Sequence, residues 1–509
     1  MASIDTLDIQ QLPRDVDVLL GVIADLQHQY GTILEALRQQ LANLRQRQFG
    51  SSSEKLAAQP ELFTETVSLP LPPVESVPVA AHRRFRRGRP QLPKDLPRRR
   101  VEYDLSPEEK ATFDRVEKIG EELSETVDYV PAQVIVIEHA RGKFRCEKDG
   151  ESTIRTAHAE PSPILKSNAS AGMLAHILVS KYADGLPLNR QERIFARHGL
   201  ELSRSTLCDW ILGSTDLLAT LMPALKAHVL AAPVIFADDT TIDLIEGGRG
   251  RATTARMWAY VSAGARQNSD GGWQDHPKAV YFEFSPTRSG SYPTRFLQDY
   301  SGYLQADDFA GYFATYRSGR VWHAACWAHA RRRYHEIART QKTPGLAAAA
   351  LRFIGRLYEI ERRLGDEPPD RRLEIRQRET VPLLTDFKGW LEGHYRTLLP
   401  RGPLAQAFGY TLSNWEALLR FTTHGMLAPD SNLVERTIRP IATGRKAWMF
   451  VASARGGAAA AVAFSLIESC KLCGVEPYAY LKDVLERLSR HRRDRLAELL
   501  PFHWQPERP

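Results

Sequence analysis

Short apolar runs alternate with helical stretches between residues 233 and 327, and their order limits the folds open to this chain. Three strand-like runs come first, followed by a helical stretch, a fourth run, a short helix and a fifth run. In chain order the segments are VIFAD, RMWAYVSA, KAVYFEF, TRFLQDY, YLQAD, FAGYFATY and VWHAAC. Short runs rich in β-branched and aromatic residues are typical of strands. We therefore predict the order β-β-β-α-β-α-β.

That order is the order of a ribonuclease-H-like core, so the predicted fold is multidomain α+β with such a mixed α/β core. After Trp327 the chain is helical for about ninety residues with no strand signal, which predicts a helical insertion. We expect the core at 229–330 and 425–464, the insertion at 331–424 and a C-terminal helical region at 465–509.

A heptad pattern marks residues 15–50 as one long helix. Its seam contains Leu19, Ile23, Leu26, Tyr30, Ile33, Leu37 and Leu44. Apolar residues at alternating steps of three and four are typical of a coiled coil. The same pattern also fits a helix packed on its own protein, and both interpretations stay open.

Residues 51–100 are interpreted as a proline-rich linker that ends in a basic arm. Between Arg83 and Arg100 there are eight arginines, one lysine and one acid, so this segment has a charge of +8. The net charge of the whole chain is +7, so the remainder is close to neutral. Charge concentrated in this way is typical of an arm that meets phosphates. Arg87 and Arg89 lie in Arg-Gly-Arg-Pro, the form of an AT-hook core, although a generic phosphate-binding arm fits equally well.

Two further regions precede the core. Residues 101–165 are expected to form a small mixed domain with strands at YVPAQVIVIEHA and GKFRCEK. Residues 166–228 are expected to be helical. There, a helix, a turn at His198-Gly199 and a second helix capped by Ser203 predict a helix-turn-helix with Arg204 at the start of its recognition helix. A helical hairpin without DNA contact is the alternative.

Three acids in separate segments form the candidate catalytic centre. Asp238 and Asp307 lie at or near the ends of strand-like runs, and Glu435 lies on an arginine-rich helical segment. Carboxylates that converge in this way hold two divalent cations, which cut and join nucleic-acid backbones. Adjacent strand residues point to opposite faces, so Asp239 and Asp308 are expected to point away from the metals.

The segment around Glu435 is also rich in groups that bind DNA. An amide and four cations are the candidate contacts: Asn432, Arg436, Arg439, Arg445 and Lys446. The first three share a helical face with the glutamate, because they lie three or four residues apart. The alternative is an amphipathic helix whose charged residues form salt bridges and do not contact DNA.

The remaining composition favours a cytoplasmic protein. Hydrophobic content is 43% and charged content 25%, as in globular proteins. No apolar stretch reaches the length of a membrane span, and the N-terminus lacks the pattern of a signal peptide. Five cysteines in 509 residues predict no disulfide framework.

At these residues the chain resembles the DDE transposases of the bacterial insertion sequences of the IS-sixty-six group. The resemblance runs over roughly residues 15–490 and rests on several long motifs in the family's order. These are FGSSSEKL, the segment from VSKYADG to STLCDW, FADDTT, YLQADDFAGY, CWAHARRRYHE, DSNLVERTIRPIATGRKAWMF and SLIESCKLCGVEPYAYL. It implies that Asp238, Asp307 and Glu435 are the metal-binding catalytic acids, with Mg²⁺, or Mn²⁺ in its place.

Two cysteine patterns bear on metals. Members of the group often carry two Cys-x-x-Cys pairs before the helical segment, whereas only Cys146 remains here. We therefore expect no structural zinc. Strand pairing in this domain is expected to rest on burial of Val134, Ile135 and Phe144 instead. Cys326 and His329 resemble a Cys-x-x-His signature found after the second aspartate in many DDE families. We interpret this pair as shaping the core rather than binding metal.

The predicted function is a DNA transposase that binds the ends of its element, cleaves at the 3′ ends and joins them to target DNA. The expected partners are double-stranded DNA (terminal inverted repeats and target), a second protomer or higher oligomer, and small accessory proteins of the element, but no membrane. The expected location is the bacterial cytoplasm, on the nucleoid when bound to DNA. The alternatives are an inactive DNA-binding descendant and a structure-specific nuclease of the same fold.

Overall fold

A computed structural model of the chain describes residues 133–148, 151–156, 162–164, 167–245, 252–341, 343–365 and 367–506. The chain divides into two compact units, residues 67–137 and the remainder, and all elements below belong to the remainder. The predicted coiled coil at 15–50 and the basic arm with Arg87 and Arg89 lie outside the described residues. Among those described, no helix combines the length and apolarity needed to cross a membrane.

A mixed sheet lies at the centre of the structure, with strand order β7-β4-β3-β8-β9. Its strands are β3 (Val234–Leu244), β4 (Thr253–Ala263), β7 (Val280–Ser285), β8 (Gly302–Gln305) and β9 (Val321–Ala324). β4 is antiparallel to both neighbours, whereas β3, β8 and β9 are mutually parallel. The short β10 (Phe450–Val451) pairs with the far end of β3. The mixed α/β architecture and the predicted order of strands are thus present.

Two differences in this region have simple causes. β3 continues six residues past Asp238, because β4 pairs with it along its whole length and the polar residues are held in the ladder. A second hairpin, β5 (Ala265–Gln267) and β6 (Trp273–Asp275), is inserted between β4 and β7. Residues 268–272 join its strands. The Asn268 amide donates to the Gly272 carbonyl at 2.7 Å, and Gly271 adopts a φ of 81°.

The helices α3 (Ala171–Tyr182), α4 (Leu188–Arg197), α5 (Arg204–Leu218) and α6 (Met222–Leu230) precede the sheet. As predicted, Gly199 makes the turn before α5, with a φ of 78°, and the Ser203 side chain caps α5 by accepting from the Thr206 amide. Between β7 and β9 lie α7 (Ser291–Phe296) and α8 (Phe313–Tyr316).

After the sheet come α15 (Asn432–Trp448), α16 (Ala454–Leu472) and α17 (Pro477–Arg487). α16 covers the outer edge of β7. The hydroxyls of Ser465 and Ser469, one helical turn apart, accept the amides of Phe282 and Val280. An edge strand whose amides are satisfied in this way cannot pair with another chain.

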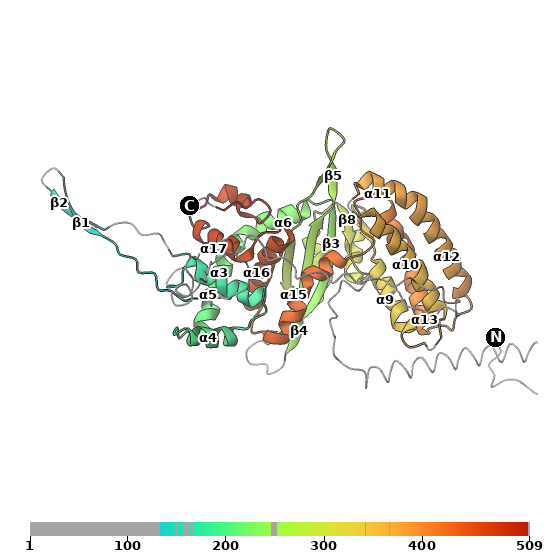
Figure 1. Cartoon of the computed structure of the whole chain (residues 1–509), viewed down its shortest axis with the longest axis horizontal. Coiled ribbons are helices and arrows are strands. Elements are labelled where there is room, and N and C mark those ends of the chain that lie inside the picture. Colours follow the sequence, from blue (N-terminus) through green and yellow to red (C-terminus); the bar gives the residue numbers. More distant parts are fainter. Residues whose placement is uncertain are drawn as a thin grey trace, which may run out of the picture. The chain divides into compact units, whose positions relative to one another are not determined.

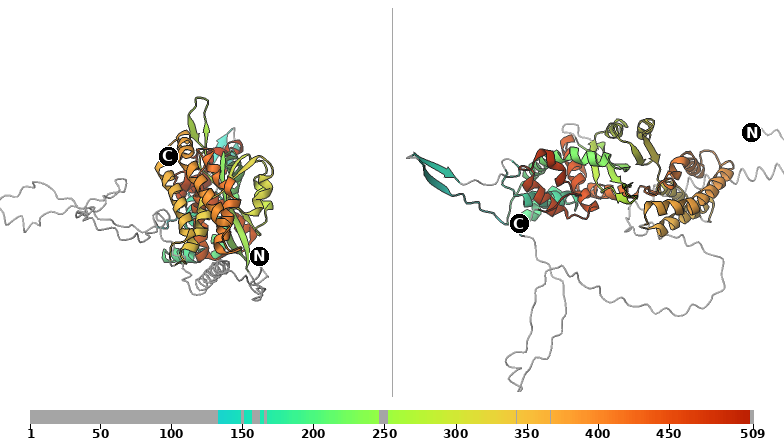
Figure 2. Two further views of the ribbon diagram at one scale, coloured as in Figure 1. Left: turned by 90° about the vertical axis from the view of Figure 1, so that its right-hand side faces the viewer. Right: turned by 90° about the horizontal axis from the view of Figure 1, so that it is seen from above.

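A group of helices lies between β9 and α15, and Figure 1 shows it to the right of β8, with two further views in Figure 2. Its members are α9 (Trp327–Ala338), α10 (Leu346–Leu364), α11 (Pro369–Ile375), α12 (Val381–Tyr395), α13 (Pro403–Ser413) and α14 (Trp415–Leu419). Trp327 anchors the group, since its indole donates to the Leu418 carbonyl and its ring packs edge-on against Trp415.

The hairpin of β1 (Lys143–Lys148) and β2 (Glu151–Thr156) contains one of the two strands predicted before the helices. The other prediction is wrong, since the described residues 133–140 form no strand. The side chains expected to support the pairing are also exposed, Ile135 by 73% and Phe144 by 59%. An apolar run becomes a strand only where a partner and a core are available, and the described residues offer this run neither.

Candidate active site

Asp238 and Asp307 lie side by side because their strands are parallel neighbours. Phe236 of β3 is in register with Gln305 of β8, and each aspartate follows two residues later. Neighbouring strands are about 4.8 Å apart, so equivalent positions bring these side chains together at the point where the pairing of β3 with β8 ends.

Glu435 is brought to the same place by contacts that hold the start of α15. The side-chain amide of Gln305 donates to the carbonyls of Ala428, at 2.6 Å, and Asp430, at 3.0 Å. The amide of Ser431 donates to the Cys326 sulfur at 3.2 Å. These bonds fix the residues just before α15, and Glu435 lies in the first turn of that helix.

The pKa of Asp238 shows that the three acids share one electrostatic environment. Burial, together with the neighbouring Asp307 and Glu435 carboxylates, raises it to about 7. The Asp239 amide, which donates to Asp238 at 2.8 Å, and the side chain of His329 act in the opposite direction. Two like charges next to a poorly solvated carboxyl disfavour its ionised form, so the site has a deficit of positive charge.

This pKa predicts how the stability of the protein depends on pH. The folded state holds the Asp238 proton more tightly than the unfolded chain, whose aspartates have a pKa near 3.8. Stability is therefore lost as pH rises from about 4 to about 7. In metal-free buffer, Asp238→Asn should raise the melting temperature near pH 8 and leave it unchanged near pH 4. The exposed Asp243→Asn is the control, and a D238N effect independent of pH would contradict the assignment.

The acids next to the three candidates have other partners. Asp239 pairs with Arg256 at 3.0 Å and with Arg288 at 2.8 Å, and its side chain is only 3% exposed. Asp308 accepts from the Asn414 amide at 3.2 Å. Each of these carboxylates is thus neutralised or hydrogen-bonded away from the cluster.

Asp430, an acid five residues before Glu435, accepts hydrogen bonds from Asn432. It accepts both the backbone and the side-chain amide of that residue. The Asp430 carboxylate therefore holds the first residue of α15, and it also engages the side-chain amide of the candidate DNA contact Asn432.

Arginines around the acids were not identified from the sequence. Arg288 bridges Asp239 and Asp307, whose Oδ2 lies 3.9 Å from its Nη2, and it stacks on the ring of Phe309. Arg332 lies 3.6 Å from Glu435 Oε2. Arg332 follows His329 by one helical turn in CWAHARRRYHE, so its spacing could have identified it. Nothing local to Arg288 marks it, because its partners are distant in sequence.

Cys326, His329 and Glu435 form a group that could hold a metal ion, with one ligand atom from each lying within 4.8 Å of the others. His329 Nε2 is 3.4 Å from Glu435 Oε1, but this buried oxygen accepts no hydrogen bond from the described residues. The Cys326 side chain is buried, which raises the pKa of its thiol to about 11. Thiolate, imidazole and carboxylate are the ligands zinc prefers.

The candidate DNA contacts on α15 are placed differently from one another. Arg436 is exposed and its Nε donates to the Asn432 carbonyl, and Lys446 is also exposed. Arg439 is half-buried. Arg445 donates to the Thr241 carbonyl of β3 at 2.9 Å, so it fastens α15 to the sheet. On α5, Arg204 pairs with Glu192 of α4 at 3.3 Å.

Comparison with known proteins identifies the family. Residues 166–459, more than half of the chain, match the Transposase IS66 family. The chain belongs to this transposase family. Residues 465–502 match the IS66 C-terminal element, 36–101 the Transposase C of IS166 homeodomain, and 113–148 the zinc-finger binding domain of transposase IS66. The resemblance seen in the sequence is thereby confirmed, and membership indicates DNA as the partner.

Three relatives from Sinorhizobium fredii extend over nearly the whole chain. The uncharacterized proteins y4hP and y4jD are each 33% identical to it, over 93% and 98% of this chain and 88% and 98% of their own lengths. The uncharacterized protein y4qI is 30% identical over 98% of this chain and 99% of its own.

The expectation that this transposase lacks structural zinc is wrong. The match of residues 113–148 to a zinc-finger binding domain overturns it, and so does the group of Cys326, His329 and Glu435, which could hold a metal ion. The prediction rested on the missing Cys-x-x-Cys pairs in the sequence. That criterion missed ligands such as this thiol and carboxylate, which are more than a hundred residues apart and meet only in the fold.

Proposed function

We propose that this transposase binds the ends of its element, cleaves the DNA at their 3′ ends and joins the new ends to target DNA. The observation that carries the proposal is the shared electrostatic environment of Asp238, Asp307 and Glu435. The sheet supports it too. An order in which one antiparallel strand lies between β7 and a parallel set favours a ribonuclease-H-like core.

The donor set fits divalent cations. Three carboxylates offer hard oxygen ligands, which Mg²⁺ and Mn²⁺ prefer. The raised pKa of Asp238 supports a bound cation here, and so does Glu435 Oε1, which accepts no hydrogen bond from the described residues. Asp238, Asp307 and Glu435 would hold the ions, which when bound lower the pKa of an attacking oxygen and neutralise charge on the phosphate.

The residues around the acids have separate tasks in this proposal. Arg288 and Arg332 orient the carboxylates of Asp307 and Glu435. Arg436, Arg439 and Lys446 bind phosphates of the DNA strand along α15, and Arg445 holds that helix on β3. Hydrolysis breaks a P–O bond and leaves a 3′-hydroxyl; transesterification then forms a new phosphodiester with the target strand and releases a target hydroxyl.

The remaining partners are proposals from the sequence. The coiled-coil helix predicted at 15–50 would pair protomers so that two element ends are handled together, and Arg87 and Arg89 of the predicted basic arm would contact DNA. Arg204 is proposed as an end contact with its helix-turn-helix.

The proposal is tested with purified full-length protein, Mg²⁺ and a duplex carrying the terminal repeats that flank the coding region. A labelled strand cut at the element end, followed by a longer joined product with supercoiled target plasmid, is expected. Binding without cleavage in Mg²⁺ or Mn²⁺ would indicate an inactive descendant. Cleavage of branched DNA without any joined product would indicate a nuclease instead.

A further inference from the structure

One face of α4 carries three arginines that the proposed function does not use. Arg190, Arg193 and Arg197 follow one another at steps of three and four residues, so they share a face of the helix. All three are exposed, and none of their side chains has an ion-pair or hydrogen-bond partner among the residues that the structure describes. Cationic groups concentrated in this way attract a polyanion.

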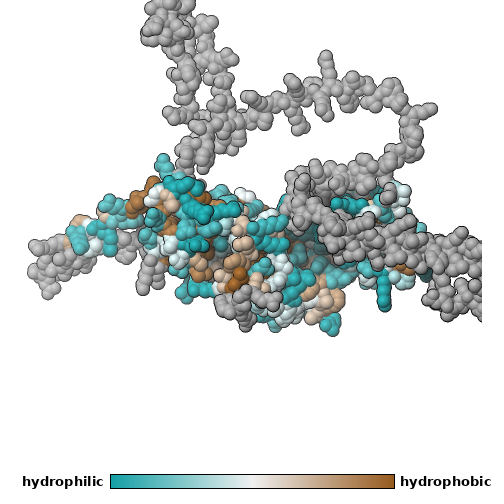
Figure 3. Space-filling model, turned by 90° about the horizontal axis from the view of Figure 1, so that it is seen from below, coloured by the Kyte–Doolittle hydropathy of each residue, from teal (hydrophilic) through white to brown (hydrophobic). Residues whose placement is uncertain are grey.

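The rest of α4 is anchored so that this face must point outward. Gln191 and Phe195, one turn apart, are the buried residues of the helix. The Gln191 side chain donates to the Leu186 carbonyl at 3.0 Å, and Phe195 packs edge-on against His176 of α3. Figure 1 shows α4 below α5. Seen from below, the surface of the molecule mixes hydrophilic and hydrophobic residues (Figure 3).

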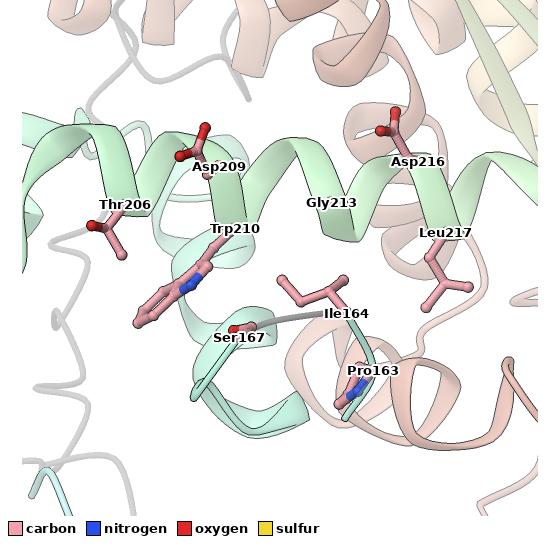
Figure 4. A pocket seen from close by; sticks show the side chains of 9 residues that line it. All are labelled: Pro163, Ile164, Ser167, Thr206, Asp209, Trp210, Gly213, Asp216 and Leu217. Atoms are coloured by element: carbon pink, nitrogen blue, oxygen red, sulfur yellow. The ribbon is translucent and has the colours of Figure 1, made fainter. Parts of the chain in front are cut away.

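The neighbouring α5, expected to be the recognition helix, is less suited than α4 to bind DNA phosphates. Its exposed side carries Asp209 and Asp216. Both line a cavity of about 540 Å³ that also includes Trp210, which Figure 4 shows along α5. The one basic residue of this helix, Arg204, is paired with Glu192. Asp216 is paired with Arg455 at 2.7 Å, but bringing Asp209 toward phosphates costs repulsion. The arginine face of α4 avoids that repulsion.

We propose that the face of α4 formed by Arg190, Arg193 and Arg197 is a DNA-backbone contact that positions the α4–α5 pair on duplex DNA. In helix-turn-helix proteins the first helix crosses the backbone, and phosphate contacts set register without reading sequence. The proposal rests on the proposed function of DNA binding, and it moves the principal electrostatic contact of this region from α5 to α4.

The test measures how affinity for a mixed-sequence duplex of about 40 base pairs depends on salt, using fluorescence anisotropy and the full chain. Each phosphate contact contributes about 0.9 to the slope of log affinity against log salt. The triple variant R190A/R193A/R197A should therefore lower the slope by about 2.7, and lower affinity on the order of 100-fold at 0.1 M salt.

Three matched variants separate a specific contact from bulk charge. R352A/R356A/R362A removes three exposed arginines from α10 and should keep the wild-type slope. R204A should change affinity less than the α4 triple variant does. R190K/R193K/R197K keeps the charges and should restore most of the slope. Circular dichroism checks that each variant is folded.

Several outcomes would overturn the proposal. The slope of the alanine triple variant could equal that of wild type, or the α10 variant could lose as much. A change in molecular mass by sedimentation with an unchanged slope would make the face a contact between protein chains. If the wild-type protein binds no duplex, the proposed function is contradicted as well. The D238N variant should bind duplex with the wild-type salt dependence but fail to cleave it. That result would separate DNA binding by α4 from the cleavage chemistry.

Discussion

Asp238→Asn is expected to abolish Mg²⁺-dependent cleavage of an end-bearing duplex while leaving DNA binding intact. An amide is neutral and offers a single oxygen ligand, so the variant lacks the negative charge and the second oxygen that a carboxylate offers a cation. Losing several kcal/mol of transition-state stabilisation, about 4 kcal/mol, corresponds to a rate at least about 1,000-fold lower. Single-turnover cleavage at saturating protein measures the loss, and anisotropy measures the binding.

Two controls come from neighbouring acids. Asp243→Asn changes an exposed aspartate on the same strand and should keep the cleavage rate. Asp308→Asn changes the residue next to Asp307, which is bound by Asn414, and should cost far less than Asp307→Asn. Equal cleavage by D238N and wild type would remove Asp238 from the active site and with it the proposed centre.

Glu361→Ala is expected to be the most damaging change outside the active site. Glu361 forms a two-pronged pair with the buried Arg376, with N–O distances of 2.8 and 2.6 Å. The Arg376 side chain is 1% exposed and that of Glu361 12%. Removing one partner of such a pair leaves a buried charge and costs about 3–5 kcal/mol. Calorimetry should show the first melting transition at a markedly lower temperature.

The structural context of Arg376 extends this effect to the active site. Arg376 begins the π-helical turn Arg376–Thr380 and donates to the carbonyls of Phe421 and Leu427, both at 2.9 Å. Leu427 directly precedes the segment that Gln305 holds before α15. Cleavage should therefore fall together with stability. The exposed Glu392→Ala, whose partner Lys388 is 3.9 Å away, should leave the melting temperature unchanged.

Replacing both members of the buried pair tests the cause. Glu361→Met with Arg376→Met leaves no buried charge, so it should recover much of the stability that E361A loses. A double variant less stable than E361A would mean that the carbonyl contacts of Arg376, rather than its charge, account for the loss.

Local patterns predicted the strands of the sheet well, because each has a strong periodic or apolar signal. The runs from VIFAD to VWHAAC became β3, β4, β7, β8 and β9, and Ser203 caps α5 as expected. The apolar run at 133–137 was wrongly predicted to be a strand, because a local pattern does not tell whether a partner strand exists. Its exposed Val136 and Ile137 show that none of the described residues covers it.

The sequence alone therefore determined the family, the order of the core elements and the three acids of the candidate site, because these depend on local motifs. Which side chains surround each acid of an adjacent pair was decided by the tertiary structure. Alternation along the strand predicted that Asp239 points away from Asp238, but only the fold brings Arg256 and Arg288 to Asp239. The same holds for α4 and α5, where Glu192 neutralises Arg204 and leaves Arg190, Arg193 and Arg197 exposed. Charge pairing is a matter of distance, and distances between remote residues exist only in the folded chain.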